Sequence, residues 1–203
     1  DIELAQRHGC DSIHVDVADG HYTKELLFGV QLVRDLSQVT DLPLGIHIAA
    51  LDQEKIIQPF LKTHAESITF QFEPAIHPER LIREIRDSGK KVGIAITPAT
   101  RYEEIEYYLD EIDIINVLCV EPGEGGQRYN EKVSEKIKRI RKYLDHNQLS
   151  TRLAVDGGVN HQTIQVLRDL GAEVFIMGSA IFSGASIGEN LENIKKQMEG
   201  KEV

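Results

Sequence analysis

Four ionisable side chains lie within apolar segments of the sequence, where charged or imidazole groups are uncommon. His14 and Asp16 occur in SIHVDV, His47 in LGIHIA and Asp156 in RLAVDG. Burying such a side chain is costly unless it is paired or binds a metal. Two imidazoles and two carboxylates that meet at strand ends could hold a divalent metal ion and could also transfer protons. These residue types predict an enzyme.

The elements that must position these residues follow from the hydrophobic pattern. Apolar segments of strand length alternate with longer segments of helical period along the whole chain. The predicted strands cover residues 12–17, 44–49, 67–72, 92–97, 114–120, 152–156 and 174–179. The predicted helices lie near residues 28–39, 52–63, 78–88, 101–111, 131–146 and 161–170. Nearly continuous apolar strands that alternate with helices are typical of a parallel sheet covered on both faces.

The number of strands points to a closed barrel. Residues 1–8 are typical of the end of a helix closed by Gly9, and such a helix should follow a strand that is absent from this sequence. Seven strands and this preceding one give eight, the number in a (β/α)8 barrel. We therefore predict a single domain, residues 1–203, with the (β/α)8 fold and without its first strand. A doubly wound open sheet has the same periodicity, so periodicity alone does not exclude it.

The alternation of side chains along the strands favours the barrel. His14 and Asp16 share one strand face with Ala18, whereas the β-branched residues between them share the opposite face. The same parity directs His47 and Asp156 inward. A barrel brings inward side chains from several strands together at its C-terminal mouth, where the catalytic groups of this fold lie.

Composition limits the kinds of partner that the chain could bind. The formal net charge of −10 argues against a broad surface for nucleic acid or anionic lipid, although a small phosphorylated ligand is compatible with it. No apolar run approaches the roughly 20 residues of a membrane span. Cys10 and Cys119 have no disulfide or metal-binding spacing, which favours two free thiols and a cytoplasmic location.

Five segments, in the right order and over essentially the whole chain, resemble the ribulose-phosphate 3-epimerase family. The family has H-x-D-x-M-D-G-H-F, then H-M-M or H-L-M, then V-x-P-G-F-G-G-Q-x-F, followed by two glycine-containing loops. The corresponding segments here are IHVDVADGHY (13–22), IHIAA (46–50), VEPGEGGQRY (120–129), VDGGVN (155–160) and GSAIF (178–182). One glycine cluster would be weak evidence, whereas five ordered motifs are strong evidence.

The resemblance implies a metal-dependent 3-epimerase of a ketose phosphate. It implies that His14, Asp16, His47 and Asp156 bind one divalent metal ion, commonly zinc, iron, manganese or cobalt, and that Asp16 and Asp156 are the acid–base pair. Epimerisation beside a ketone removes a proton from one face and returns one to the other, so one carboxylate on each face suits the reaction. The metal would stabilise the enediolate formed between the two transfers. No NAD, flavin or pyridoxal cofactor is needed.

The resemblance also implies a phosphate site of the kind usual in barrels, where the last two loops and a helix N-terminus supply backbone N–H donors. The residues expected in these loops are Gly157, Gly158, Gly178 and Ser179. A further loop with Gly125, Gly126 and Gln127 is expected to close over the substrate. The expected partner is a small phosphosugar, and a homo-oligomer is expected because barrels of this type often associate.

Several positions depart from the family pattern. Ala18, Ala49 and Leu118 replace methionines around the enediolate, which predicts a wider pocket. Glu124 replaces a phenylalanine, and Gln71 stands where many members have histidine. We therefore predict a substrate other than ribulose 5-phosphate, such as a ketohexose 6-phosphate.

Two alternative functions stay open on the sequence. One is another phosphosugar isomerase or aldolase of the same fold, although no lysine is found at an inward strand end for Schiff-base chemistry. The other is a catalytically silent phosphosugar-binding protein. Asp19 is expected to hold the turn at Gly20 and to take no part in the chemistry.

Overall fold

The strands of the protein form a single sheet that curls into a ring. The structure, a computed structural model, describes residues 1–123 and 125–198. The strand order is β2-β1-β3-β4-β5-β6-β7-β8, and every neighbouring pair except β1 and β2 is parallel. The strands are β1 (Ile13–Asp19), β2 (Leu26–Leu27), β3 (Leu44–Ala49), β4 (Ser67–Gln71), β5 (Lys91–Ile96), β6 (Ile114–Leu118), β7 (Arg152–Asp156) and β8 (Val174–Ile176). All seven predicted strands are confirmed.

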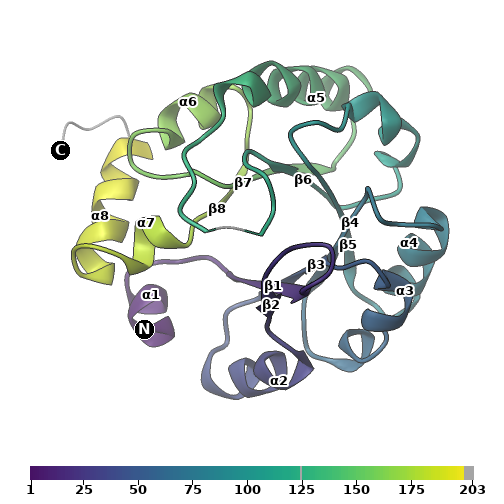
Figure 1. The fold of residues 1–203 in the computed structure, drawn as a ribbon. Coiled ribbons are helices and arrows are strands. Elements are labelled where there is room, and N and C mark those ends of the chain that lie inside the picture. The colour runs from purple at the N-terminus through teal and green to yellow at the C-terminus, as the bar shows by residue number, and fades with distance from the viewer. Residues whose placement is uncertain (124, 199–203) are drawn as a thin grey trace.

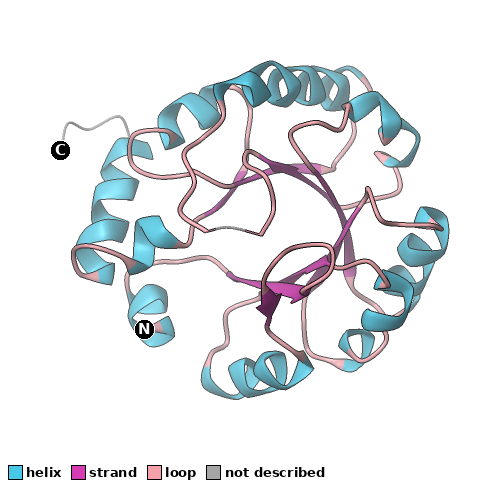
Figure 2. Ribbon diagram, in the orientation of Figure 1, coloured by secondary structure: helices cyan, strands magenta, loops and turns pink. Residues whose placement is uncertain are grey.

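Helices connect successive parallel strands and form a layer outside the ring, as Figures 1 and 2 show. The α-helices are α1 (Ile2–Arg7), α2 (Val30–Val39), α3 (Gln53–Ile56), α4 (Pro78–Asp87), α5 (Ser134–His146), α6 (Ile164–Asp169), α7 (Ser179–Phe182) and α8 (Ile187–Met198). The 3₁₀ helices are η1 (Phe60–Lys62), η2 (Tyr102–Glu104), η3 (Glu106–Tyr108) and η4 (Glu131–Val133). This arrangement confirms the predicted barrel class. Among the described residues, no helix has the length and apolar character needed to span a membrane.

Two predicted helices are wrong in extent. The segment 52–63 divides into α3 and η1, because Pro59 lies between them and has no N–H to continue a helix. The segment 101–111 forms the two short 3₁₀ turns η2 and η3 instead of an α-helix. Its three tyrosines are weaker helix formers because aromatic side chains lose rotamer freedom in a helix, and the buried Ile105 and Leu109 hold the turns against the core.

Strand ends also differ from the prediction, and one short strand was not predicted. The predicted strand 174–179 stops at Ile176, and Ser179 already begins α7. The two-residue strand β2 was not predicted, and it pairs antiparallel with Ala18 and Asp19. A pair this short has too little periodicity to be recognised in a sequence.

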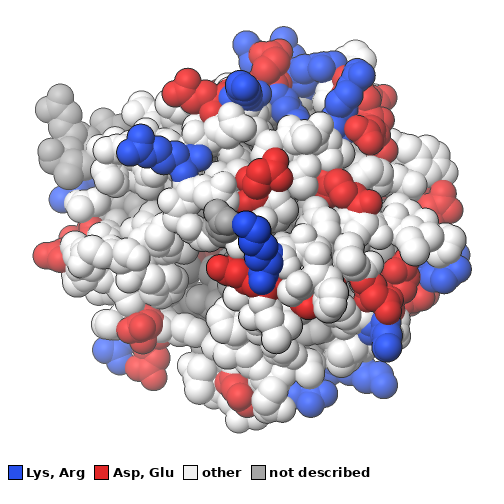
Figure 3. All heavy atoms as spheres, in the orientation of Figure 1, with Lys and Arg blue, Asp and Glu red and all other residues white. Residues whose placement is uncertain are grey.

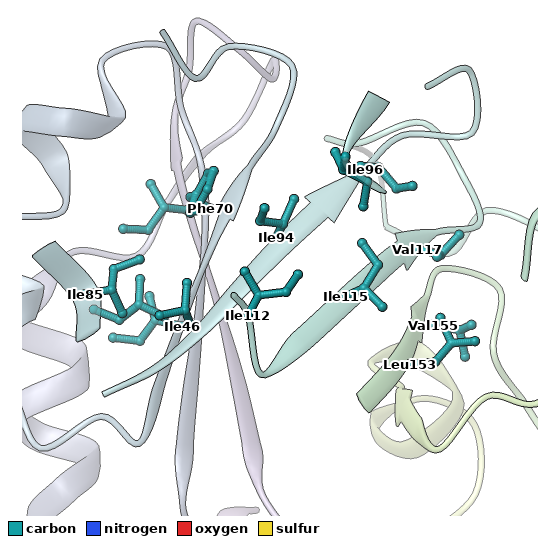
Figure 4. Close-up of a cluster of buried hydrophobic side chains, with 14 of the residues drawn as sticks. Ile46, Phe70, Ile85, Ile94, Ile96, Ile112, Ile115, Val117, Leu153 and Val155 are labelled. Atoms are coloured by element: carbon teal, nitrogen blue, oxygen red, sulfur yellow. The ribbon is translucent and has the colours of Figure 1, made fainter. Parts of the chain in front are cut away.

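The bulky aliphatic side chains lie between the strands and the outer helices. Ile46, Phe70, Ile94, Ile115 and Val155 are all buried, and they alternate along their strands with inward-facing residues. Figure 4 shows these side chains together on the ribbon. The residues that alternate with them face the inside of the ring, and many of these are small or polar. They include Gly45, Ser67, Thr69, Gly93, Ala95 and Ala154. Small inward residues leave the interior of the ring available to the polar groups of the mouth.

In the described part of the chain, the ring of strands is open at one point, between β8 and β1. There β8 pairs with β7, and β1 pairs with β2 and β3, but no ladder joins β8 to β1. The additional strand inferred from residues 1–8 would lie at this point. That strand stays a prediction.

The close contact between β4 and β5 generates a stability prediction. A Cβ atom added at Gly93 would lie 2.2 Å from Thr69 Oγ1 and 2.9 Å from Thr69 Cβ. Gly93→Ala should therefore lower the free energy of unfolding by about 1–3 kcal/mol through overpacking. The loss should be smaller in a Thr69→Ala background, where the hydroxyl and methyl groups are absent. Urea denaturation of the two single variants and the double variant measures this coupling, and equal losses in both backgrounds would contradict it.

Candidate metal and active site

The four predicted ligand residues meet at one point inside the ring. One ligand atom from each of His14, Asp16, His47 and Asp156 lies within 4.8 Å of the other three. His14 and Asp16 come from β1, His47 from β3 and Asp156 from the last position of β7. The register places Asp16 directly beside His47, because β1 and β3 are adjacent parallel strands. The predicted convergence of these four side chains is confirmed.

Asp16 lies at the centre of the cluster. Its Oδ1 atom is 3.0 Å from His47 Nδ1 and 3.3 Å from His14 Nε2. Burial by itself would raise the pKa of Asp16, but the hydrogen bonds and charges of the two histidines outweigh it and hold the pKa well below its usual range. The side chain is 47% exposed and His47 is 3% exposed, so Asp16 connects a buried imidazole with the open mouth.

The second carboxylate has the opposite electrostatic environment. Asp156 Oδ2 lies 3.9 Å from His14 Nε2, beyond the range of a direct hydrogen bond. Burial raises the pKa of Asp156, the nearby charge of His14 opposes that rise, and the charge of Asp16 adds to it. For His14, burial lowers the pKa, but the hydrogen bond and charge of Asp16 together with the charge of Asp156 raise it overall. The pKa values of the two carboxyl groups are therefore shifted in opposite directions.

The donor set fits a divalent metal ion. Two imidazole nitrogens and two carboxylate oxygens are ligands that zinc, iron, manganese and cobalt accept in proteins. All four donors belong to strand residues whose backbones are fixed by ladder hydrogen bonds. A cation among them would neutralise two carboxylates that otherwise repel each other. The cluster could therefore hold a metal ion.

Asp19 holds the turn after β1, as predicted. Its Oδ1 atom accepts hydrogen bonds of 2.9 Å from the backbone N–H groups of His21 and Tyr22. Its Oδ2 atom accepts another, also of 2.9 Å, from the N–H of Leu51 after β3. The carboxylate thus joins the ends of the two strands that carry three of the four ligand residues.

The loops after β1 and β6 lie over the centre of the ring (Figure 1). They are in contact, because a Cβ atom at Gly123 would lie 2.8 Å from Thr23 Cβ. Gly125 and Gly126 are exposed in the second loop, and Gln127 Nε2 donates to the Glu121 carbonyl at 2.7 Å. The predicted departure at Glu124 lies outside the described residues. Figure 3 shows acidic and basic side chains interspersed on this face.

The residues predicted to bind phosphate lie beyond the ends of β7 and β8. Gly157 and Gly158 directly follow Asp156 and have φ angles of +97° and +68°, which side-chain-bearing residues rarely adopt. Gly178 immediately precedes α7, which begins at Ser179. Within residues 1–123 and 125–198, no backbone N–H of these four residues donates to a protein acceptor. Their role in phosphate binding stays a prediction.

Two polar residues next to the cluster were not assigned a role from the sequence. Gln71 lies inward at the end of β4 and contacts His47 Nε2, and Glu73 contacts Gln71. The available signal was parity, since Gln71 and Glu73 continue the inward alternation of Thr69. Polar side chains at successive inward positions beside a ligand histidine indicate a supporting network.

The fold and the cluster together define a class of protein. Parallel barrels with convergent ionisable residues at the carboxyl ends of their strands are enzymes whose chemistry occurs at that mouth. Within this class, the chain belongs to the ribulose-phosphate 3-epimerase family, since the model of the Ribulose-phosphate 3 epimerase family matches residues 1–182. The predicted resemblance is confirmed.

Named relatives support the same assignment. The ribulose-phosphate 3-epimerase of Mycobacterium tuberculosis is 33% identical over 195 residues, which cover 96% of this chain and 85% of that protein. The ribulose-phosphate 3-epimerase of Bacillus subtilis is 31% identical, with 96% of this chain and 90% of that protein covered. The chloroplastic ribulose-5-phosphate-3-epimerase of Arabidopsis thaliana is 35% identical, with 96% of this chain and 69% of that protein covered. The family is thus one of carbohydrate epimerases, a class of isomerases.

Solved structures with low sequence identity share the fold. A phosphoribosyl anthranilate isomerase from Thermus thermophilus has a TM-score of 0.68 at 13% identity, covering 98% of this chain and 92% of that chain. A mutant tryptophan synthase α-subunit from Pyrococcus furiosus has a TM-score of 0.70 at 15% identity, covering 97% and 89%. At this level of identity the likeness confirms the barrel and says nothing about the reaction.

The contrast between the two carboxylates predicts opposite effects on the stability of the metal-free protein. The lowered pKa of Asp16 means that its charged form stabilises the fold at every pH above 3.8, its ordinary value, and that this contribution declines as the pH falls further. The raised pKa of Asp156 means that its charged form opposes folding at neutral pH. Asp16→Asn should therefore lower the melting temperature at pH 7, and Asp156→Asn should leave it equal or higher.

Thermal unfolding with a chelator present, measured between pH 7 and pH 3, tests this contrast. The difference between the two variants should narrow as the pH falls, because the carboxyl group of Asp156 becomes protonated first, and below pH 3.8 the stabilisation by Asp16 declines as its carboxyl group is protonated in the unfolded chain. An equal loss of stability in both variants at pH 7 would show that the two sites do not differ in this way.

Proposed function

We propose that the protein is a metal-dependent 3-epimerase of a phosphorylated ketose. The observation that carries the proposal is the convergence of two histidines and two aspartates at one point of a barrel from this family. The relatives are named for the 3-epimerisation of ribulose phosphate, which needs two proton transfers on opposite faces of one carbon. A site with two carboxylates of unlike protonation preference suits that requirement.

Asp16 and Asp156 are the proposed acid–base pair. Asp16 is held ionised by two histidines, so it can accept the proton from the carbon beside the ketone. Burial raises the pKa of Asp156 above its ordinary value, so Asp156 is the carboxyl group proposed to return a proton to the other face. In the reverse direction the two residues exchange roles. They originate on two separate strands of the barrel, β1 and β7.

The same quartet would hold the metal ion. A divalent cation bound by His14, Asp16, His47 and Asp156 would supply positive charge to the oxygens of the enediolate form of the sugar. Zinc, iron, manganese and cobalt all fit the donor set. The protein residues fix the position of this charge, since three of the four are strand residues joined by the Asp16 contacts.

The phosphate group of the sugar is proposed to bind the loops after β7 and β8. The supporting observation is that Gly157, Gly158, Gly178 and Ser179 have backbone N–H groups without protein acceptors in the described ranges 1–123 and 125–198. N–H groups of this kind bind phosphate in many barrels. The loop with Gly125, Gly126 and Gln127 is proposed to cover the bound sugar.

The proposed substrate is a ketose phosphate larger than ribulose 5-phosphate, such as a ketohexose 6-phosphate. Ala18 and Ala49 are register partners at the ends of β1 and β3, next to the ligand residues, and Leu118 is the register partner of Asp156. All three have short or compact side chains, and the alternation along their strands directs them toward the inside of the mouth. Residues of this size leave room for an additional carbon unit.

We also propose a cytoplasmic location and self-association. Cys10 and Cys119 are free thiols, which favours a reducing compartment. Leu26 in β2 and Phe28 just after it are 80% and 53% exposed, and such apolar side chains are common in contacts between subunits. We expect the partner in the reaction to be a small phosphosugar and not a nucleic acid.

Metal binding should stabilise the protein against heat. Binding of zinc at 100 times its dissociation constant should raise the free energy of unfolding by about 2.7 kcal/mol. His47→Leu should abolish most of this gain, because it removes one imidazole ligand from the quartet. The matched control is His146→Ala, an exposed histidine at the end of α5, which should keep the full gain. Thermal unfolding with and without zinc measures both, and an equal gain in His47→Leu would contradict the assignment of this ligand.

Proton exchange at C3 of the sugar tests the proposed reaction directly. In heavy water the metal-loaded protein should incorporate deuterium at C3 of a ketose phosphate, which proton NMR detects. Asp16→Asn and Asp156→Asn should each reduce the exchange rate by about 10²–10⁴-fold, since each removes one acid–base group. Thr151→Val is the control, because Thr151 bonds only to backbone carbonyls remote from the cluster.

The same assay separates the alternatives. Tight binding of a phosphosugar without deuterium incorporation would identify a silent binding protein and overturn the proposal. Turnover of ribulose 5-phosphate and of a ketohexose 6-phosphate should be compared in parallel. A clear preference for ribulose 5-phosphate would remove the proposed substrate while leaving the epimerase.

A further inference from the structure

A line of buried polar contacts connects β4 to the ligand histidine on β3. The Gln71 side chain is completely buried, and its Oε1 atom lies 3.0 Å from His47 Nε2. Its Nε2 atom donates to Glu73 Oε2 at 2.5 Å. The backbone of Gln71 exchanges two hydrogen bonds of 2.8 Å with the side chain of Gln53, which is also completely buried. Gln53 therefore holds the backbone of Gln71, and His47 and Glu73 contact the two ends of its side-chain amide.

Glu73 determines the direction in which the Gln71 amide points. An ionised carboxylate only accepts hydrogen bonds, so the amide must face it with its NH₂ group. Glu73 Oε1 also accepts from the Thr97 backbone N–H at 2.7 Å and from the Thr100 hydroxyl. Burial alone would raise the pKa of Glu73, but these hydrogen bonds outweigh it and keep the pKa below its ordinary value. The oxygen of Gln71 is consequently the atom that faces His47.

The amide oxygen of Gln71 in turn selects one tautomer of His47. Because that oxygen accepts, His47 must donate from Nε2. A neutral imidazole carries one N–H group, so its Nδ1 atom then has a free lone pair. Nδ1 is the atom that lies 3.0 Å from Asp16 Oδ1 inside the quartet. In the metal-free protein a proton on Nδ1 can fill this contact as a hydrogen bond, and a metal ion bound by Nδ1 and Asp16 would take the place of that proton.

We infer that Gln71, oriented by Glu73, is a positioning residue that keeps His47 in the Nε2–H form and so directs its Nδ1 lone pair at the metal ion. The inference rests on the metal centre of the proposed function but adds residues that lie outside the ligand quartet and outside the five segments that carry the resemblance. Removal of an outer hydrogen-bond partner of a ligand histidine typically weakens metal binding by about 10–100-fold.

Zinc affinity of the full chain, measured by competition with a chelating dye, gives the first readout. Gln71→Leu preserves approximate size and removes the acceptor, so its zinc dissociation constant should rise by about 10–100-fold. Gln71→His should stay near the parent value, because an imidazole can donate to Glu73 with one nitrogen and accept from His47 with the other. Glu73→Gln should be intermediate, since an amide at this position can accept or donate and no longer fixes the direction of Gln71.

A stability control accompanies these variants. Thr151→Val also removes buried hydrogen bonds, to the carbonyls of Leu109 and Ile112, but contacts no residue of the cluster. Its zinc affinity should equal that of the parent protein. A weakening in Thr151→Val as large as that in Gln71→Leu would show that loss of stability explains the effect, and it would overturn the inference.

Nitrogen NMR of histidine-labelled, zinc-loaded protein gives the second readout, which general destabilisation does not change. The parent protein should show His47 protonated at Nε2 and metal-bound at Nδ1, and Gln71→Leu should show loss or mixing of this state. Parent-like affinity and tautomer in Gln71→Leu would overturn the inference. If that variant does not fold, the same parent-like result in Glu73→Gln overturns it.

The failure of this inference is distinguishable from that of the proposed function. No sugar is present in either measurement, so an absence of epimerase turnover leaves both results valid. A parent protein that binds no zinc would overturn the inference together with the metal centre. If the parent protein binds zinc but changes at Gln71 and Glu73 do not weaken that binding, only the inference is overturned and the metal centre stands.

Discussion

The structure depends on one constraint, which is that four ionisable side chains must be held together inside a ring of apolar strands. Asp16 meets this constraint by lying between His14 and His47, where the hydrogen bonds outweigh the cost of burial. Asp156 lies farther from the imidazole of His14, at 3.9 Å, and burial raises its pKa. The same asymmetry shifts the pKa values of the two carboxyl groups in opposite directions, which suits their proposed roles as base and acid.

The division of side chains across the sheet makes this arrangement possible. Bulky residues such as Ile46 and Ile94 fill the space beneath the helices, whereas Gly93 and Ala95 keep the interior open. A shift of one residue in the β1–β3 register would turn Asp16 away from the interior and separate it from His47. The hydrophobic layer therefore fixes the register, and the register fixes the site.

Support for the site extends beyond the four clustered residues to their neighbours on β1, β3 and β4. Asp19 joins the ends of β1 and β3 through the backbone of Leu51. Glu73 and Gln71 extend from β4 to the buried ring of His47. These contacts leave the ligand side chains little freedom of rotation, which lowers the ordering cost of binding a metal ion or a sugar.

The sequence by itself determined the strands, the inward parity of the four ligands and the family, because these depend on local period and on motif order. The division of 52–63 and 101–111 into short turns, and the pairing of β2, depended on contacts that local patterns do not contain. The roles of Gln71 and Glu73 likewise emerged only in three dimensions. Hydrogen-bond partners 24 residues apart, such as Gln71 with His47, become neighbours only when adjacent strands align, so the tertiary structure alone decides which atom of an amide faces which atom of an imidazole.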